Sequence, residues 1–180
     1  MEDDIIKRAY DFAREKHRGQ LRDGGEEYII HPLRVAQLVL KYKPSKNIKL
    51  LIAGSLLHDT LEDTYTSYRE IEENFGELIA SLVMELTSAK YVPKLEGKDV
   101  YLAHKMENMT SYALCIKLAD RLDNLMDLSN TNEEKKIRML NQTKNIVDYL
   151  KTHRKLTVAQ KRLIGKIEEV LNDYRIIGEK

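Results

Sequence analysis

Apolar residues recur three or four positions apart along most of this chain, which is the spacing of one face of an α-helix. The first group predicts a helix that begins near Ile5 and ends near Gly19. Further groups with this spacing predict helices after Pro32, after Asn47, after Ser67, over 78–86, and from about Lys98, Ser111, Thr131 and Thr157. The pattern therefore predicts an all-α fold.

Polar residues that favour helix ends stand where these apolar groups begin and stop. Asn47 is predicted to cap the helix that follows it, and Gly76 to end another. Three pairs have the spacing of a capping box, in which each residue satisfies a backbone group of the other. They are Ser67 with Glu70, Thr131 with Glu134, and Thr157 with Gln160.

Composition agrees with this pattern and excludes several classes of protein. Eight glycines and three prolines are few for 180 residues, and neither type occurs over 98–164, whereas a β-rich fold needs frequent turn residues. Lysine and arginine number 30 against 29 acidic residues, a balance that argues against a nucleic-acid coat and a polybasic membrane anchor. The longest apolar stretch, 50–57, is far short of the about 20 residues that cross a bilayer. A single cysteine, Cys115, and an acidic N-terminus lead us to expect a cytoplasmic protein.

The segment over 56–63 concentrates potential metal ligands and acid–base groups. His58, Asp59, Glu62 and Asp63 fall within six positions, directly after an apolar helix. If the helix continues, the three carboxylates share a face and repel one another, so a divalent cation would compensate them. The alternative is a solvated acidic helix end, which the helix macrodipole disfavours.

Two further polar features are ambiguous when each is taken alone. Lys117, Asp120, Asn124 and Asp127 form one polar stripe on a predicted helix, and such a stripe is most often a solvent face. His31 stands at the entrance of the helix that begins near Pro32, where a histidine serves as a cap, a surface residue or a ligand.

Taken in order, these segments resemble the HD metal-dependent phosphohydrolase superfamily, and most closely its RelA/SpoT-type alarmone hydrolase domain. The resemblance covers about residues 5–150. It is carried by HRGQLR at 17–22, YIIHP at 28–32, LHDTLEDT at 57–64, NFG at 74–76 and KLADRLDN at 117–124.

The resemblance implies an all-α, single-domain HD-type helical bundle with a metal site between helices. The HD domain would span 1–155, and a C-terminal helix over 156–180 would pack on the same domain. The implied metal ligands are His31, His58, Asp59 and Asp120. Two imidazoles and two carboxylates suit Mn²⁺, Fe²⁺ or Zn²⁺, and the resemblance favours Mn²⁺.

The resemblance also implies hydrolysis of the 3′-pyrophosphate of ppGpp or pppGpp, the alarmones of the stringent response. Glu62 and Asp63 would orient the attacking water or shuttle its proton. Arg22 would stack on guanine, Tyr28 would line that pocket, and Asn124 would contact the ribose or a phosphate. Asp127 would accept from the guanine edge, as an acidic residue there resembles the short animal-type hydrolases. Lys117 and Arg121 would bind substrate or instead pair with neighbouring carboxylates.

Other functions stay open at this point. The same chemistry would serve another nucleotide phosphate ester, such as NADPH or a deoxynucleoside monophosphate. A nucleotide-binding regulatory module without turnover is a further alternative, and a helical interaction protein leaves the ordered motifs unexplained. We expect a small guanosine nucleotide as partner, with neither nucleic acid nor membrane, and leave the choice between monomer and homodimer open.

Overall fold

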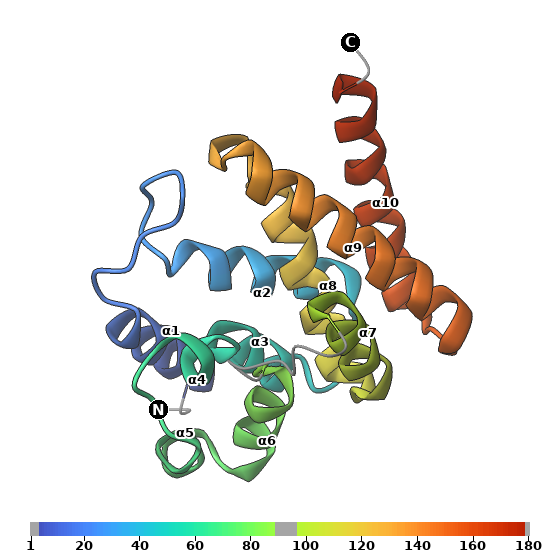
Figure 1. Ribbon diagram of the computed structural model, residues 1–180. Helices are drawn as coiled ribbons and strands as arrows, with labels where there is room; N and C mark the ends of the chain where they lie inside the picture. Colours follow the sequence, from blue (N-terminus) through green and yellow to red (C-terminus); the bar gives the residue numbers. More distant parts are fainter. Residues whose placement is uncertain (1–3, 89–96, 179–180) are drawn as a thin grey trace. The chain divides into compact units, whose positions relative to one another are not determined.

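In the computed structural model, the described residues are 4–88 and 97–178, with side chains described as far as residue 174. Within these ranges the chain is helical, and its one extended pairing is an isolated antiparallel bridge between Leu21 and Glu27. The prediction of an all-α fold is confirmed. The chain divides into two compact units, Met1–Lys90 and Tyr91–Lys180 (Figure 1). The predicted division into a domain over 1–155 and a final helix stays a prediction.

The first unit is organised around one apolar helix, α3. Every residue from Leu51 to Leu57 is buried, as expected for a helix that is apolar on all sides. It contacts α1 and α2, and also α6, which packs on α5. The helices of this unit are α1 (Ile5–Lys16), α2 (Ile30–Tyr42), α3 (Ile48–Leu57), α4 (Thr60–Asp63), α5 (Tyr68–Phe75) and α6 (Glu77–Leu86).

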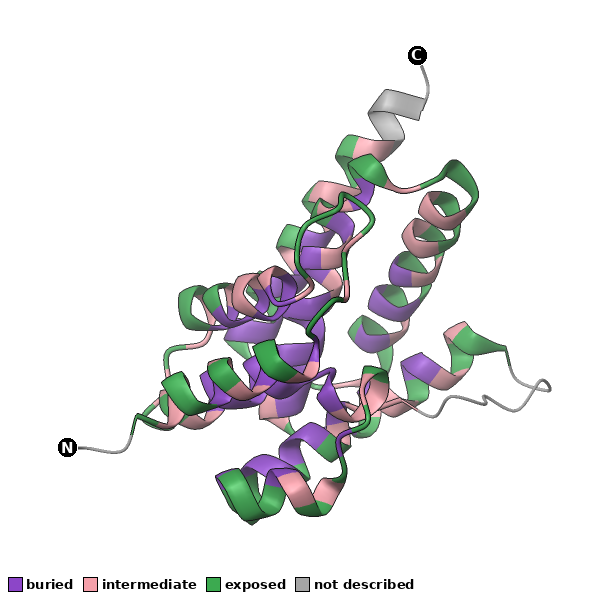
Figure 2. Ribbon diagram, turned by 90° about the vertical axis from the view of Figure 1, so that its left-hand side faces the viewer, coloured by how far each residue is buried: buried purple, intermediate pink, exposed green. Residues whose placement is uncertain are grey.

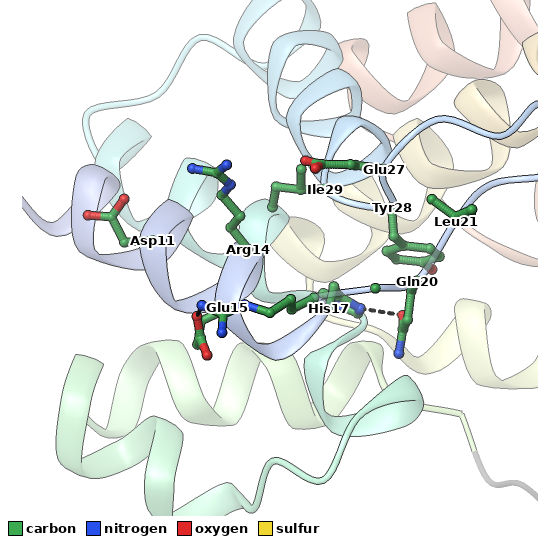
Figure 3. A pocket seen from close by; sticks show the side chains of 11 residues that line it. Asp11, Arg14, Glu15, His17, Gln20, Leu21, Glu27, Tyr28 and Ile29 are labelled. Atoms are coloured by element: carbon green, nitrogen blue, oxygen red, sulfur yellow. Dashed lines mark hydrogen bonds and ion pairs between the residues drawn. The ribbon is translucent and has the colours of Figure 1, made fainter.

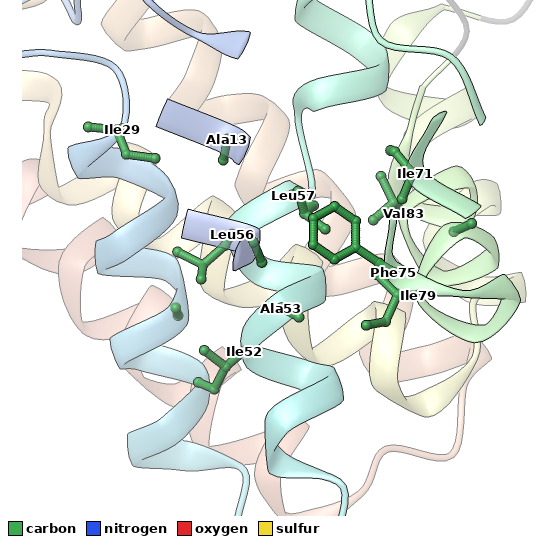
Figure 4. Close-up of a cluster of buried hydrophobic side chains, with 13 residues drawn as sticks. Ala13, Ile29, Ile52, Ala53, Leu56, Leu57, Ile71, Phe75, Ile79 and Val83 are labelled. Carbon is green, nitrogen blue, oxygen red and sulfur yellow. The ribbon is translucent and has the colours of Figure 1, made fainter. Parts of the chain in front are cut away.

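Buried hydrophobic side chains of the first unit pack around the C-terminal end of α3. Figure 4 shows Leu57 beside Phe75, with Ile79 and Val83 of α6 on the same side. Phe12 of α1 meets Phe75 edge to face, with ring centroids 5.3 Å apart. This packing fixes the C-terminal end of α3, which leads directly into the histidine and carboxylates singled out above.

The second unit is likewise built on a buried helix, α8, which contacts α9 and α10, while α7 packs against α9. Buried residues line one side of most of these helices and exposed residues the other, as the amphipathic pattern predicts (Figure 2). The elements are α7 (Lys98–Asn108), α8 (Ser111–Met126), the 3-10 helix η1 (Leu128–Asn130), α9 (Glu133–His153) and α10 (Val158–Gly178). No described helix is both long and apolar enough to cross a membrane.

Two of the three predicted capping boxes are confirmed at least in part. Ser67 Oγ accepts a hydrogen bond from the Glu70 amide at 3.1 Å. Thr157 and Gln160 bond reciprocally: the Thr157 amide donates to Gln160 Oε1 at 2.8 Å, and the Gln160 amide to Thr157 Oγ1 at 3.4 Å. Gly76 ends α5 with a φ of +83°, a conformation that a glycine adopts without steric cost.

Other local predictions are wrong. Asn132, not Thr131, caps α9, because its side chain accepts the Lys135 amide at 2.9 Å. Asn47 does occupy the N-cap position of α3, but its side chain makes no capping hydrogen bond. Leu78, which the apolar spacing predicts to face inward, is 76% exposed. Periodicity identifies one face of a helix, but it does not say where along that face the packing partner ends.

Candidate active site

His31, His58 and Asp59 converge in the first unit. His31 lies in the first turn of α2, and His58 and Asp59 form the turn between α3 and α4. Their exposed fractions are only 1%, 1% and 9%. Asp59 Oδ2 lies 3.0 Å from His58 Nε2 and 3.6 Å from His31 Nε2, and the two imidazole centroids are 5.1 Å apart.

The chemistry of this group fits a divalent cation. His58 Nδ1 lies 2.8 Å from the carbonyl oxygen of Ser55. A carbonyl can only accept, so Nδ1 carries a hydrogen, and in the neutral ring Nε2 presents its lone pair toward the Asp59 carboxylate. Two electron-rich atoms 3.0 Å apart in a buried site call for a positive charge near them. Neutral imidazole nitrogens and carboxylate oxygens are the usual ligands of such ions in proteins.

The helix does not continue unbroken through the acidic segment. α3 ends at Leu57, and α4 is a single turn that begins at Thr60. The break is bridged locally, because the Thr60 hydroxyl donates to the Leu57 carbonyl at 2.7 Å and the Asp63 amide to the Asp59 carbonyl at 2.9 Å. The interruption places His58 and Asp59 in a turn, where both side chains reach His31.

Glu62 and Asp63, the predicted catalytic pair, point to different partners. Glu62 Oε2 accepts the amide of Ser88 at 2.8 Å. Asp63 Oδ2 lies 3.4 Å from the hydroxyl of Tyr28. Burial, and after it the charge of Asp59, raises the pKa of Asp63 above its ordinary value. A carboxylate with a raised pKa accepts a proton more readily, which suits the predicted role of Asp63.

Tyr28, predicted to line a nucleotide pocket, contacts a candidate metal ligand. Its hydroxyl donates to Asp59 Oδ2 at 2.6 Å. The guanidinium carbon of Arg22, the predicted guanine-stacking residue, lies 5.8 Å from the centroid of the Tyr28 ring. Arg22 and Asp59 therefore both contact this one tyrosine, which links the predicted base contact to the acidic cluster.

The sequence predicted no specific role for His17, which is the first residue of the HRGQLR motif. It is 3% exposed, stacks on Tyr28 with centroids 4.5 Å apart, and lies with its Nδ1 2.8 Å from Gln20 Oε1. Burial lowers the pKa of His17, so the ring is neutral near pH 7. Within the part of the chain that the structure describes, no group hydrogen-bonds its buried Nε2. Figure 3 shows His17 and Tyr28 beside a cavity of about 480 Å³ between α1 and the loop that leads to Ile29.

The second unit holds Asp120 between two donors on α8. Lys117 Nζ lies 2.9 Å from Asp120 Oδ2, and Asn124 Nδ2 donates to Asp120 Oδ1 at 2.6 Å. The side chains of Lys117 and Asp120 are 11% and 8% exposed, so this stretch of the polar stripe is not a solvent face. Asp127 is the C-cap residue of α8, and its amide donates to the Asp123 carbonyl at 3.1 Å.

Arg121 lies against α9. Its guanidinium donates to Gln142 Oε1 at 2.9 Å and to Thr143 Oγ1 at 3.3 Å, and Gln142 in turn donates to Asp99 at 2.9 Å. Desolvation lowers the pKa of Arg121, and the nearby Asp120 and Asp99 carboxylates oppose that shift. These contacts join α8 to α9.

Each predicted site residue thus has a definite set of neighbours within its own unit. The first unit brings together candidate ligands and acid–base groups, namely His31, His58, Asp59 and Asp63, with Tyr28 donating to the acids and Arg22 beside Tyr28. The second unit brings together Lys117, Asp120 and Asn124. Glu62 and Arg121 point to partners outside these two groups.

Comparison with known proteins identifies relatives of most of the chain. The HD domain family matches residues 9–155. A guanosine-3′,5′-bis(diphosphate) 3′-pyrophosphohydrolase of Aquifex aeolicus is 43% identical over 150 residues, covering 78% of this chain but only 20% of the relative's length. The enzyme of that name called MESH1, from Xenopus tropicalis, is 39% identical over 132 residues, covering 72% of this chain and 73% of the relative.

Solved structures agree. A metazoan ortholog of SpoT, described as hydrolysing ppGpp, superposes with a TM-score of 0.80 and 26% identity, covering 97% of each chain. A protein from Listeria monocytogenes EGD-e, at 20% identity and a TM-score of 0.64, shares the fold over 82% of this chain. With the family's match to residues 9–155 and a relative of similar length at 39% identity, this chain belongs to the HD domain family.

Proposed function

We propose that this chain hydrolyses the 3′-pyrophosphate of ppGpp or pppGpp, releasing pyrophosphate and leaving GDP or GTP. The observation that carries the proposal is the convergence of the His31 imidazole of α2 on the His58 imidazole and the Asp59 carboxylate in the buried turn after α3. The Xenopus tropicalis relative, which this chain matches over 73% of its length, bears the name of that activity.

The ion would be held by His31, His58 and Asp59 of the first unit together with Asp120 of α8. We propose Mn²⁺ as this ion, with Fe²⁺ and Zn²⁺ as the alternatives that the donor set also suits. When bound, a divalent ion supplies Lewis acidity, making water more acidic and polarising a phosphoryl group.

The chain's own residues would divide the remaining work. Asp63, whose pKa is raised, accepts the proton of the water that attacks the phosphorus bound to the 3′-oxygen. The bond between that phosphorus and the 3′-oxygen breaks, the 3′-oxygen takes up a proton to become a hydroxyl, and pyrophosphate leaves. Glu62, anchored by the Ser88 amide, helps to orient the water.

Substrate contacts come from the loop before α2 and from α8. Arg22 stacks on guanine, for which its planar guanidinium is suited. The Tyr28 ring contacts the Arg22 guanidinium through a cation–π interaction. Asn124 and Lys117 face the phosphates or the ribose, and Asp127 accepts from the guanine edge. Arg121 supports this part of α8 by donating a hydrogen bond to Gln142 of α9. We place the activity in the cytoplasm.

Pyrophosphate release by metal-stripped protein, with and without added Mn²⁺, tests the proposal. The same plate carries GTP, NADPH and a deoxynucleoside monophosphate as rival substrates, whose turnover is read by release of inorganic phosphate as well as pyrophosphate, and Fe²⁺ and Zn²⁺ as rival ions. We expect Mn²⁺-dependent release from ppGpp, its loss in His58→Ala, and its retention in His104→Ala, a matched change at an exposed histidine. Turnover of a rival alone would reject the alarmone, and bound metal without any turnover would favour the regulatory module.

A further inference from the structure

His17 contacts two residues that lead to the acidic side of the candidate site. It follows directly after α1 as the C-cap residue of that helix. Its contacts are with Tyr28 and Gln20, which reach Asp59 and Asp63 respectively. The two contacts use different properties of the imidazole, namely its flat face and its Nδ1–H.

The first contact fixes the tyrosine ring. His17 and Tyr28 stack with centroids 4.5 Å apart and planes 23° from parallel. The phenolic hydroxyl is rigidly attached to that ring, and it donates to Asp59 Oδ2 at 2.6 Å. Since a hydrogen bond weakens steeply with distance and angle, the orientation of the ring decides how well this bond is made. His17 thereby orients a donor to a candidate metal ligand without touching the ligand.

The second contact fixes the end of α4. The Gln20 amide nitrogen donates to the carbonyl oxygen of Asp63 at 2.9 Å. That assignment turns Gln20 Oε1 toward His17, so Nδ1 of the imidazole carries the hydrogen and donates across 2.8 Å. The Asp63 carbonyl belongs to the last residue of α4, where no helical amide follows to bond it. The His17–Gln20 pair therefore holds the backbone of Asp63 in place.

We propose that His17 is a positioning residue for Asp59, acting through Tyr28, and for Asp63, acting through Gln20. The inference rests on the proposed function in taking Asp59 as a metal ligand. Partners that orient a metal ligand typically change metal affinity or activity by roughly 10- to 100-fold when they are removed. The competing explanation is that His17 only packs the base of the loop over 18–29, in which case its loss lowers stability and leaves metal affinity unchanged.

The test is a double-mutant cycle read by Mn²⁺ titration calorimetry of metal-stripped protein without substrate. Tyr28→Phe keeps the ring and removes the hydroxyl, so it should weaken Mn²⁺ binding by at least about tenfold. His17→Ala should weaken Mn²⁺ binding by about fivefold or more in the wild-type background and leave it unchanged in the Tyr28→Phe background. Equal weakening in both backgrounds would overturn the route through Tyr28.

Two further variants separate positioning from packing. His17→Phe keeps the stack and loses the bond to Gln20, so its Mn²⁺ affinity should stay within about twofold of wild type while kcat falls. His104→Ala, at an exposed histidine, should leave both unchanged. If His17→Ala lowers Tm but not Mn²⁺ affinity, the positioning role is wrong. Because the titration needs no substrate, wild-type protein that binds Mn²⁺ yet leaves ppGpp intact would reject the proposed function separately from this inference.

Discussion

Replacing Lys117 by methionine tests directly whether Asp120 is a metal ligand. The Lys117 ammonium lies 2.9 Å from Asp120 Oδ2, and both side chains are almost fully buried. In metal-free protein the Lys117 ammonium compensates the negative charge of the Asp120 carboxylate. Methionine fills a similar volume without charge, so Lys117→Met leaves a buried carboxylate supported by the Asn124 amide.

The magnitude follows from this geometry. Removing one member of a buried ion pair costs about 3–5 kcal/mol, because the remaining charge is left uncompensated. The hydrogen bond from Asn124 retains part of the support, so we expect a loss of about 3 kcal/mol in metal-free protein. For a chain of this size 1 kcal/mol corresponds to about 2–4 °C, which places the fall in Tm at roughly 6–12 °C.

The decisive measurement is thermal unfolding of the same variant in EDTA and in saturating Mn²⁺. A bound cation replaces the lost ammonium, so the deficit should shrink to about 1 kcal/mol in Mn²⁺. The difference of about 2 kcal/mol is roughly a thirtyfold tighter binding of Mn²⁺ by Lys117→Met. Lys144→Met is the matched control, since it breaks an exposed pair with Asp148 and should cost under about 1 kcal/mol in either condition. Equal losses for Lys117→Met with and without Mn²⁺ would refute Asp120 as a ligand.

Three other changes have defined expectations. Burial and the charge of Asp59 raise the pKa of Asp63 in the folded protein above its ordinary value of 3.8. At any pH above 3.8, the cost of ionising Asp63 in the folded state therefore lowers the free energy of unfolding. Metal-free Asp63→Asn should therefore be more stable than wild type in urea at pH 7, with the gain vanishing as the pH falls below 3.8, and an equal gain at both ends would contradict this reasoning. Gly76→Ala should cost about 1 kcal/mol at its φ of +83°, whereas Gly165→Ala, in open space on α10, should gain about 0.5–1 kcal/mol; denaturant titration that finds the same sign for both would be inconsistent with the backbone argument. Arg22→Ala should raise KM for ppGpp with kcat nearly kept, and an unchanged KM accompanied by a lower Tm would dismiss the stacking role.

Much of the fold could be predicted from the amino-acid sequence, because helices and their caps depend on interactions between residues close together in the chain. The apolar spacing predicted the longer helices of the described chain, but neither the single-turn α4 nor the 3-10 helix η1. The capping boxes at Ser67 and Thr157 were recognisable because their partners stand three residues away. Where a competing residue stood next to the expected cap, as Asn132 does beside Thr131, local chemistry alone did not decide between them. The ordered HD motifs indicated the family before any coordinates, since each motif is contiguous.

The partners of the functional side chains depended on tertiary structure. Tyr28 meets Asp59 across 31 positions and Glu62 meets Ser88 across 26, and no periodicity carries information over such separations. The sequence by itself determined the helices, the family and the identity of the candidate ligands. Only the packed chain decided that Lys117 is buried on Asp120, that Glu62 and Asp63 diverge, and that His17 lies behind Tyr28. The physical reason is that burial leaves a polar group only the donors and acceptors that packing brings beside it.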